Sequence, residues 1–271
     1  MIIGGFSDFA APGGAVVVKC DRLSEFSGLA HGFSTRLGGV SGAEFSSLNL
    51  SFGRGDGDEN VEQNFSRFAL SAGLSKNAYA FTNQIHRDCV RRVGSADVFA
   101  PAPGYTAPDC DGLVTAEAGV PLLGKNADCV PVLLYCPKPR VCAFAHAGWR
   151  GTAMAIVKNA VLEMEKLGAA PGDIIAAVGP SISPCCFLTH SDVTDALLPL
   201  GQEILRDRIL PSADGRTAVD LKAINAALLE QAGVGEVWVC PDCTCCMEDK
   251  YYSHRRNGPA RGSMAAVIQL L

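Results

Sequence analysis

Two apolar segments joined by a short polar loop place the strongest constraint on how this chain folds. Residues 130–135 (VPVLLY) and 141–145 (VCAFA) are almost wholly aliphatic, aromatic or small, and CPKPR (136–140) separates them. Short apolar runs bounded by turn residues are typical of strands buried on both faces. The two segments therefore predict an antiparallel hairpin inside a sheet.

The open ends of this hairpin carry two residues of metal-binding type. If the turn is centred on Pro137 and Lys138, Cys129 faces His146 with Cβ atoms about 5 Å apart on one face of the sheet. A thiolate and an imidazole at that spacing can bind one zinc ion through bonds of roughly 2.3 and 2.0 Å. This register predicts two of the ligands of a metal site.

His86 is the natural third ligand, because it ends another apolar stretch, residues 79–86. Three protein ligands leave one position of a tetrahedral zinc ion open, which is typical of catalytic rather than structural zinc. The open position would hold a water made acidic by the metal or a polarised substrate oxygen. The alternative is that His86 is a hydrogen-bonded loop residue, and spacing alone does not separate the two.

The loop after the second strand is suited to binding an anion. HAGWRGT (146–152) contains two glycines and leads into a predicted helix over 152–167, whose N-terminus offers free N–H groups and a positive dipole end. Arg150 adds a guanidinium that can bind phosphate or carboxylate through two hydrogen bonds. The pattern matches neither a P-loop nor a dinucleotide fingerprint, so a tight turn with a solvated Arg150 is the alternative.

The rest of the chain predicts strands and helices in mixed order. Further strands are expected at 11–19, 79–86, 89–93, 112–115, 174–178, 236–239 and 264–270, and further helices at 58–70 and 220–232. This order is not a regular βαβ alternation, so we expect an α/β fold with a mixed sheet and helices packed on it. No internal repeat or low-complexity linker divides residues 1–271, which favours a single domain.

Composition narrows the partners and the compartment. The formal net charge is -5 and no Lys/Arg run stands out, which argues against nucleic acid as the partner. No apolar run approaches the roughly 20 residues that cross a bilayer, and the first residues lack the pattern of a signal peptide. We therefore expect a cytoplasmic protein with no membrane partner. The sequence does not indicate its oligomeric state.

Twelve cysteines require an explanation in such a chain. In a reducing compartment they are expected to be buried thiols, metal ligands or nucleophiles rather than disulfides. The segment CPDCTCC (240–246) contains C-x-x-C, which can be redox-active or half of a structural zinc site. No clear second C-x-x-C exists, although the adjacent Cys185 and Cys186 can approach it. Buried or loop thiols are the favoured interpretation.

Several segments together resemble the YfiH/YlmD family, long labelled multicopper polyphenol oxidase or laccase-domain proteins. They are FSTRLGGVSG (33–42), SLNL (47–50), NQIH (83–86), DGLVT (111–115), ADCVPVLL (127–134), AHAGWRGT (145–152), VGPSISPCCF (178–187) and CTCCMEDKYYSHRRNG (243–258). The resemblance covers the chain from His31 to its C-terminus.

The resemblance implies a zinc-dependent purine nucleoside phosphorylase whose Zn²⁺ ligands are His86, Cys129 and His146. It implies phosphorolysis of adenosine, inosine, guanosine and methylthioadenosine to the base and sugar 1-phosphate, with adenosine deamination as a side activity. It also implies a mixed-sheet α/β sandwich that is similar to cysteine hydrolases. A nucleoside and phosphate are then the expected small-molecule partners.

Five positions are candidates for binding substrate or phosphate oxygens: Arg36, Arg150, the helix amide of Gly151, Arg255 and Arg256. Structural ion pairs are the alternative role for the arginines. Asp128 is expected to orient a neighbouring group or to cap a strand end. The sequence departs from the family pattern at Arg87, Asn126 and His254, which leaves the substrate preference open.

Three other functions compete with this interpretation. A copper redox enzyme could use the same site with Cu²⁺, but five histidines and no His-x-His do not suit a multicopper centre. A metal-free cysteine hydrolase would use Cys129 as nucleophile and His146 as base. A nucleoside-binding protein without turnover would use the same pocket.

Overall fold

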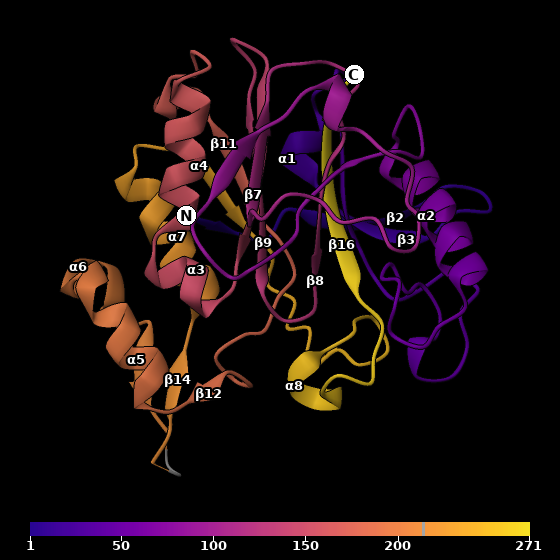
Figure 1. The fold of residues 1–271 in the computed structure, drawn as a ribbon. Helices are drawn as coiled ribbons and strands as arrows, with labels where there is room; N and C mark the ends of the chain where they lie inside the picture. Colours follow the sequence, from indigo (N-terminus) through magenta and orange to yellow (C-terminus); the bar gives the residue numbers. More distant parts are fainter. Residues whose placement is uncertain (213–214) are drawn as a thin grey trace.

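The computed structural model describes residues 1–212 and 215–271. Within these residues, two large β-sheets pack face to face, and helices cover the outer face of each sheet (Figure 1). A third, small sheet of three strands lies at one end of the molecule. The mixed-sheet α/β sandwich expected from the sequence is confirmed.

The larger sheet contains the predicted hairpin at its centre. Its strand order is β1-β15-β11-β9-β10-β7-β6, with β9 antiparallel to both neighbours and β11 parallel to β15. The strands are β1 (Ile2–Ile3), β6 (Val90–Arg92), β7 (Gly112–Thr115), β9 (Val130–Cys136), β10 (Val141–Ala147), β11 (Ile175–Val178) and β15 (Glu236–Val239). β9 and β10 are buried along their whole length, as their apolar sequences require.

The second sheet has the order β2-β3-β4-β16-β8-β5. Its strands are β2 (Phe6–Ala10), β3 (Val16–Cys20), β4 (Leu29–Ser34), β5 (Ala80–Phe81), β8 (Leu122–Asn126) and β16 (Met264–Leu270). The small sheet consists of β12 (Leu188–Thr189), β13 (Ile209–Pro211) and β14 (Thr217–Val219).

The helices are α1 (Asp21–Ser24), α2 (Asp58–Ala72), α3 (Trp149–Ala153), α4 (Ile156–Glu165), α5 (Ser191–Leu197), α6 (Gln202–Leu205), α7 (Leu221–Gln231) and α8 (His254–Asn257). The apolar faces of α4 and α7 pack on the outer side of the larger sheet, and that of α2 packs on the outer side of the second sheet (Figure 1). Short 3-10 turns occur at Ala43–Phe45, Ser95–Asp97, Pro171–Asp173 and Leu198–Leu200. Among residues 1–212 and 215–271, no helix is both long and apolar enough to cross a membrane.

The core between the two sheets depends on close approach of their backbones. Phe144 on β10 is fully buried and faces β8, where a Cβ placed on Gly124 would lie 2.0 Å from the phenyl ring. Only glycine therefore fits at this position of β8. Replacing Phe144 by alanine would cost about 3–5 kcal/mol, as is usual for a large buried aromatic side chain.

The register expected for the central hairpin is wrong by two residues. β9 and β10 pair Cys136 with Val141, so that His146 faces Pro131 and not Cys129. The turn contains four residues, 137–140, rather than two. Its two prolines lack the N–H that a strand pair needs, which keeps the ladder from continuing into 137–140. Cys129 accordingly lies just before β9 begins.

Other expected boundaries also differ. The strand expected at 79–86 is limited to Ala80–Phe81, and the segment after it is a loop. The helix expected at 152–167 starts at Trp149 and is divided at Ala155, whose φ of 56° is incompatible with a continuous right-handed helix. β4 and β8 were not expected as strands. The helix expected at 220–232 is present as α7, with the Asp220 side chain accepting a hydrogen bond from the backbone of Ala223.

Candidate active site

Three residues far apart in the sequence meet beside the edge of the larger sheet. His86 lies in the loop between β5 and β6, Cys129 just before β9, and His146 near the end of β10. Their side-chain ligand atoms lie within 4.8 Å of one another, and the two imidazole rings are 5.1 Å apart, centroid to centroid. The structure therefore brings together the residues predicted as ligands, which we call the cavity triad.

Asp111 fixes the geometry of the cavity triad from the side that faces the protein interior. Its fully buried carboxylate lies 2.9 Å from Nδ1 of His146, which leaves Nε2 to face the site. The same carboxylate accepts the backbone N–H groups of Ile85, His86 and Arg87 at 2.9–3.1 Å. A carboxylate behind a histidine is a common support of metal sites, because it fixes the tautomer and the ring orientation. Sequence reasoning did not assign this role to Asp111.

The backbone around the triad takes conformations that need such support. His86 has a φ of 59°, a left-handed conformation that is unfavourable for a residue with a side chain. The hydrogen bonds from this loop to Asp111 hold it there. Strained backbone of this kind is concentrated at functional sites, where the surrounding structure maintains it.

Gly148 leaves the space that the triad occupies. A Cβ built on this residue would lie 3.0 Å from Sγ of Cys129 and 3.2 Å from Cδ2 of His86. Its φ of -64° and ψ of 169° are accessible to any residue, so the requirement for glycine comes from contact and not from backbone conformation. The first glycine of HAGWRGT thus leaves room for the side chains of Cys129 and His86.

The charges of the triad favour the form of cysteine that binds metals. Burial would raise the pKa of the Cys129 thiol, but His146 and His86 lower it below its usual range. Burial would likewise lower the pKa of His146, but Cys129 and Asp111 raise it. A thiolate is the nucleophile and the metal ligand among the forms of cysteine. The site can therefore supply a thiolate at neutral pH.

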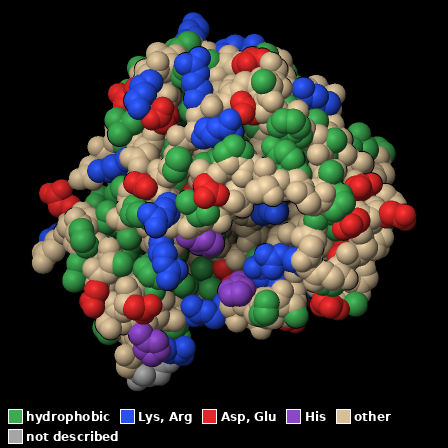
Figure 2. All heavy atoms as spheres, viewed as in Figure 1, with side chains coloured by type: hydrophobic (Ala, Val, Ile, Leu, Met, Phe, Trp, Pro, Cys, Tyr) green, Lys and Arg blue, Asp and Glu red, His purple; other side chains and the backbone are tan. Residues whose placement is uncertain are grey.

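The triad lines a cavity of about 580 Å³. Figure 2 shows a hollow in this face of the molecule with Lys, Arg and His side chains around it. The cationic residues of the lining are Arg54, Lys125, Arg150, Arg255 and Arg261. Among the described residues that line the cavity, Asp128 is the one acidic residue. The excess of positive charge suits an anionic ligand.

Arg261 is the most unusual of these cations. It is 9% exposed, and its buried Nε has no hydrogen-bond partner, whereas Nη1 donates to the backbone of Gly262. Burial, followed by the charge of Arg54, lowers its pKa. In the part of the chain that the structure describes, no salt bridge pairs Arg54, Lys125 or Arg261 with a carboxylate. Sequence reasoning found none of these three cations.

Of the positions predicted to bind substrate or phosphate, Arg150 lines the cavity. Its guanidinium lies 4.0 Å from the ring of Trp149, over the aromatic face. Gly151 is buried in α3 and is not part of the lining. A Cβ at Gly151 would lie 3.3 Å from the backbone oxygen of His146, so this glycine allows α3 to start close to the strand end.

Arg36 lies outside the cavity lining. Its guanidinium donates to the backbone oxygens of Ser46 and Glu248 and packs over the ring of Tyr252. These contacts join two loops. The position of a loop arginine is set by such tertiary contacts, which no sequence periodicity encodes.

Asp128 connects the triad to the C-terminal loops. Its carboxylate accepts hydrogen bonds from Oγ1 of Thr244 at 2.7 Å, Oγ of Ser253 at 2.9 Å and the backbone N–H of Arg255 at 2.6 Å. Its φ of 83° turns the chain sharply before Cys129. Arg255, the fourth predicted substrate ligand, lines the cavity.

Comparison with known proteins covers the same region of the chain. The family model described as multi-copper polyphenol oxidoreductase laccase matches residues 30–271. A purine nucleoside phosphorylase of Deinococcus radiodurans is 41% identical over 240 residues, which are 89% of this chain and 88% of that protein. Purine nucleoside phosphorylase YlmD of Geobacillus stearothermophilus is 36% identical over 251 residues, 90% of each chain.

A solved structure supports the same relationship. The crystal structure of Bacillus licheniformis hypothetical protein YfiH matches with a TM-score of 0.87 and 31% sequence identity, covering 97% of this chain and 99% of that chain. The family match at 30–271 includes every residue that lines the cavity.

Proposed function

The chain belongs to the YfiH/YlmD family of laccase-domain proteins, and on this premise we propose that it is a zinc-dependent purine nucleoside phosphorylase. The observation that carries the proposal is a cavity in which two histidines and a cysteine lie beside five cationic side chains. The relatives named purine nucleoside phosphorylase support the reaction class. We propose adenosine, inosine, guanosine and methylthioadenosine as substrates, and adenosine deamination as a side activity.

His86, Cys129 and His146 would hold the metal ion. Two imidazoles and a thiolate are ligands that zinc prefers, and three protein ligands leave one position for a reactant. Zinc bound there would polarise a substrate oxygen or make a bound water acidic. Only two of the chain's five histidines belong to the triad, which favours Zn²⁺ over a multicopper centre. Asp111 keeps the ring of His146 in the tautomer that a metal requires.

The cations of the cavity would bind phosphate. Arg261 is the strongest candidate, because its buried Nε is unpaired and Arg54 is a neighbouring like charge. An anion between them would satisfy the free donor and relieve the repulsion. Arg150 and Arg255, on the same lining, could contact either phosphate or the nucleoside, with the α3 backbone around Gly151 behind them. Arg36 is left out of this site because it lies outside the cavity lining, where it donates to the backbone oxygens of Ser46 and Glu248.

The reaction needs both substrates in one place. A phosphate oxygen forms a bond to C1′ of the sugar, while the bond from C1′ to the base nitrogen breaks. The base nitrogen keeps the electron pair of that bond and takes the proton that the phosphate loses. The products are the free base and the sugar 1-phosphate. The cavity volume lies in the range of small-molecule sites, and the arginines would hold phosphate against C1′.

The direct test measures hypoxanthine released from inosine with and without phosphate. Wild-type protein should release it only with phosphate, and Cys129→Ser should lose more than about 100-fold in rate, since weakening even the outer support of a metal costs 10–100-fold. Cys89→Ser, at an exposed cysteine outside the cavity, is the matched control and should keep full activity. Release by Cys129→Ser at the wild-type rate would refute the proposal.

Arg261→Gln tests the phosphate site in the same assay. Losing hydrogen bonds to a charged group costs about 1.5–3 kcal/mol, so the KM for phosphate should rise about 10-fold or more. Arg92→Gln, at an exposed arginine of β6 outside the cavity, should leave this KM unchanged. An unchanged phosphate KM in Arg261→Gln would place phosphate elsewhere.

One observation favours a second candidate, a metal-free cysteine hydrolase. Cys129 and His146 shift each other's pKa in opposite directions, which is also the pairing of a cysteine nucleophile with its base. Mass spectrometry during turnover separates the two candidates. A covalent adduct on Cys129 would favour the hydrolase, and stoichiometric zinc bound through the same thiolate would exclude it.

A cytoplasmic location stays a prediction. Twelve free thiols suit a reducing compartment. The proposed partners are the nucleoside and phosphate, with no role for nucleic acid.

A further inference from the structure

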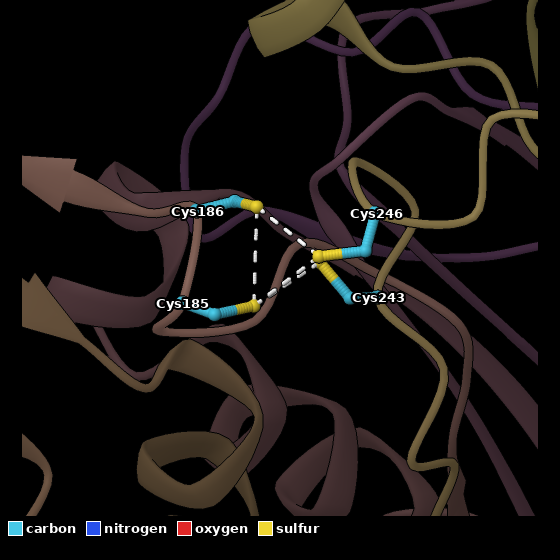
Figure 3. A group of neighbouring side chains, drawn as sticks. All are labelled: Cys185, Cys186, Cys243 and Cys246. Carbon is cyan, nitrogen blue, oxygen red and sulfur yellow. Dashed lines mark hydrogen bonds between the residues drawn. The ribbon is translucent and has the colours of Figure 1, made fainter.

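Four cysteines gather outside the cavity, between two surface loops (Figure 3). Cys185 and Cys186 lie in the loop between β11 and β12, and Cys243 and Cys246 lie in the loop that follows β15. Their four sulfur atoms lie within 4.8 Å of one another, and Figure 3 shows the side chains pointing toward a common centre. We call this group the four-cysteine cluster.

The sulfur–sulfur distances match a metal site. The sulfur of Cys246 lies 3.3 Å from that of Cys186 and 3.5 Å from that of Cys185, which is itself 3.7 Å from that of Cys243. Four thiolates bound tetrahedrally to zinc at about 2.3 Å are separated by about 3.8 Å along each edge. A disulfide bond would require about 2.05 Å. The four sulfurs surround a space that fits one tetrahedral ion.

The backbone places both loops at the same edge of the larger sheet. β11 and β15 are adjacent parallel strands, so their following loops leave in the same direction. An isolated bridge between Ser181 and Cys243 extends this pairing beyond the strand ends. The backbone N–H of Ser183 donates to Sγ of Cys243 at 3.4 Å, a contact that stabilises a thiolate. The cluster is thus held by regular structure on both sides.

Two arginines supply positive charge beside the cluster. Nη1 of Arg255 donates to the backbone oxygen of Cys186 at 2.9 Å, and Nη1 of Arg256 donates to that of Cys245 at 2.7 Å. Four thiolates and one divalent cation leave a net charge of minus two, which these guanidiniums offset. Each arginine is also tied to the backbone of one cysteine loop, so α8 connects the two loops.

We propose that Cys185, Cys186, Cys243 and Cys246 bind a second metal ion, Zn²⁺, with a structural role. Four cysteine ligands complete a tetrahedral coordination and leave no position for a substrate, which is the arrangement of structural zinc sites. Thiolate ligands in tetrahedral geometry select zinc or iron among common metals. The site is distinct from the cavity triad, and it stands whether or not the chain is a phosphorylase.

The cluster is connected to the cavity by short links. Thr244, between two of the cysteines, donates to Asp128, the residue before Cys129. Phe187, directly after Cys186, lines the cavity. A metal ion in the cluster would therefore fix one wall of the cavity, although it takes no part in the chemistry.

Metal content measured by mass spectrometry tests this proposal, with Cys129→Ser used to empty the cavity triad. We expect two zinc ions in wild-type protein, one in Cys129→Ser, and none in the double variant Cys129→Ser/Cys246→Ser. The matched control Cys129→Ser/Cys89→Ser changes an exposed cysteine that belongs to neither group, and should keep one. Zinc-free Cys129→Ser, or a disulfide recognised by a mass two hydrogens lower, would overturn the proposal.

A second measurement keeps the proposal testable if the double variant does not fold. Cobalt exchanged into folded Cys129→Ser should give the strong visible bands and the sulfur-to-metal charge-transfer bands of a tetrahedral four-thiolate site. Weak bands typical of six-coordinate cobalt would overturn the proposal. Iron found in place of zinc in the protein as purified would overturn the assignment of zinc.

Discussion

The cavity triad and the four-cysteine cluster place similar ligands in two different surroundings. The triad supplies three donors at a cavity, with Asp111 behind one of them and cations in front. The cluster supplies four donors between loops, and two of its cysteines are exposed. An open coordination position is useful only where a substrate can reach it, whereas a closed one serves only to hold the chain together. The difference predicts that changes in the triad affect activity and changes in the cluster affect stability.

The largest loss of activity is expected from a change in Asp111, the carboxylate that holds the cavity triad in place. Asp111→Asn keeps the shape but removes the negative charge and one of the acceptor oxygens used by His146 and the loop of His86. Zinc affinity, measured by competition with a chelator, and kcat for inosine should each fall about 10–100-fold. Zinc in the four-cysteine cluster should stay bound. Wild-type zinc affinity in Asp111→Asn would show that the carboxylate does not orient the site.

The cluster should show the opposite pattern. An ion present at a free concentration of about 100 times its Kd stabilises the folded protein by about 2.7 kcal/mol, and this stabilisation is lost when the site is removed. In Cys246→Ser this loss should lower Tm by about 5–10 °C, measured by calorimetry. The kcat for inosine should change less than the KM, because the cluster touches only the wall of the cavity. A large loss of kcat with an unchanged Tm would contradict the division of roles.

A smaller effect is expected from crowding the triad without removing a ligand. Gly148→Ala places a Cβ 3.0 Å from Sγ of Cys129 and 3.2 Å from Cδ2 of His86, so both ligands must move by a few tenths of an ångström. Overpacking of this kind costs about 1–3 kcal/mol, and zinc affinity should fall about 10-fold or more. Gly172→Ala is the control, since nothing lies within 4 Å of its Cβ. Equal zinc affinity in the two variants would mean that Gly148 only shapes a turn.

The smallest effect concerns a buried histidine outside both sites. Burial, followed by the charge of Lys19, lowers the pKa of His31 to about 3, and its Nε2 accepts the N–H of Cys20 at 3.0 Å. His31 is therefore neutral in the folded chain but takes a proton near pH 6.5 when unfolded. Its contribution to stability is complete above pH 6.5 and is lost as the pH falls towards 3.

At pH 5.5, protonation of His31 in the unfolded chain lowers the free energy of unfolding by about 1.4 kcal/mol relative to its value above pH 7. His31→Gln, which keeps an acceptor, should lose less stability than wild type between pH 7.5 and 5.5, as measured by urea unfolding. Identical losses in the two proteins would show that folded His31 takes up a proton as readily as unfolded His31, so that burial does not lower its pKa. His146 differs from His31 in this respect, because Cys129 and Asp111 raise its pKa. A lowered pKa marks a histidine buried in the core, and a raised pKa marks one beside a thiol and a carboxylate.

The residue types of the triad could be predicted from the sequence, but their geometry could not. His86, Cys129 and His146 lie together although the hairpin register was wrong, because Cys129 reaches the site from the loop before β9. The short strand β5 and the loop after it follow from hydrogen bonds to Asp111, which is 25 residues away from His86 in the sequence. No local pattern contains such a contact.

The four-cysteine cluster shows the same limit. From the sequence, the C-x-x-C in 240–246 was either redox-active or half of a zinc site, with buried or loop thiols favoured over both, and Cys185 and Cys186 were named as residues that can approach it. That they do so depends on β11 and β15 being neighbours, which is a property of the sheet order. Arg261 and Arg54 were missed for a related reason, since the burial of Arg261 and its proximity to Arg54 arise only when the loops pack.

Diffraction from crystals of wild-type protein on both sides of the zinc absorption edge tests the central claim most directly. The account predicts two anomalous peaks, one bonded to His86, Cys129 and His146 with an open position facing the cavity, and one at the centre of the four cysteines. A peak absent from the triad, or a fourth protein ligand closing it, would contradict the catalytic role assigned to this site.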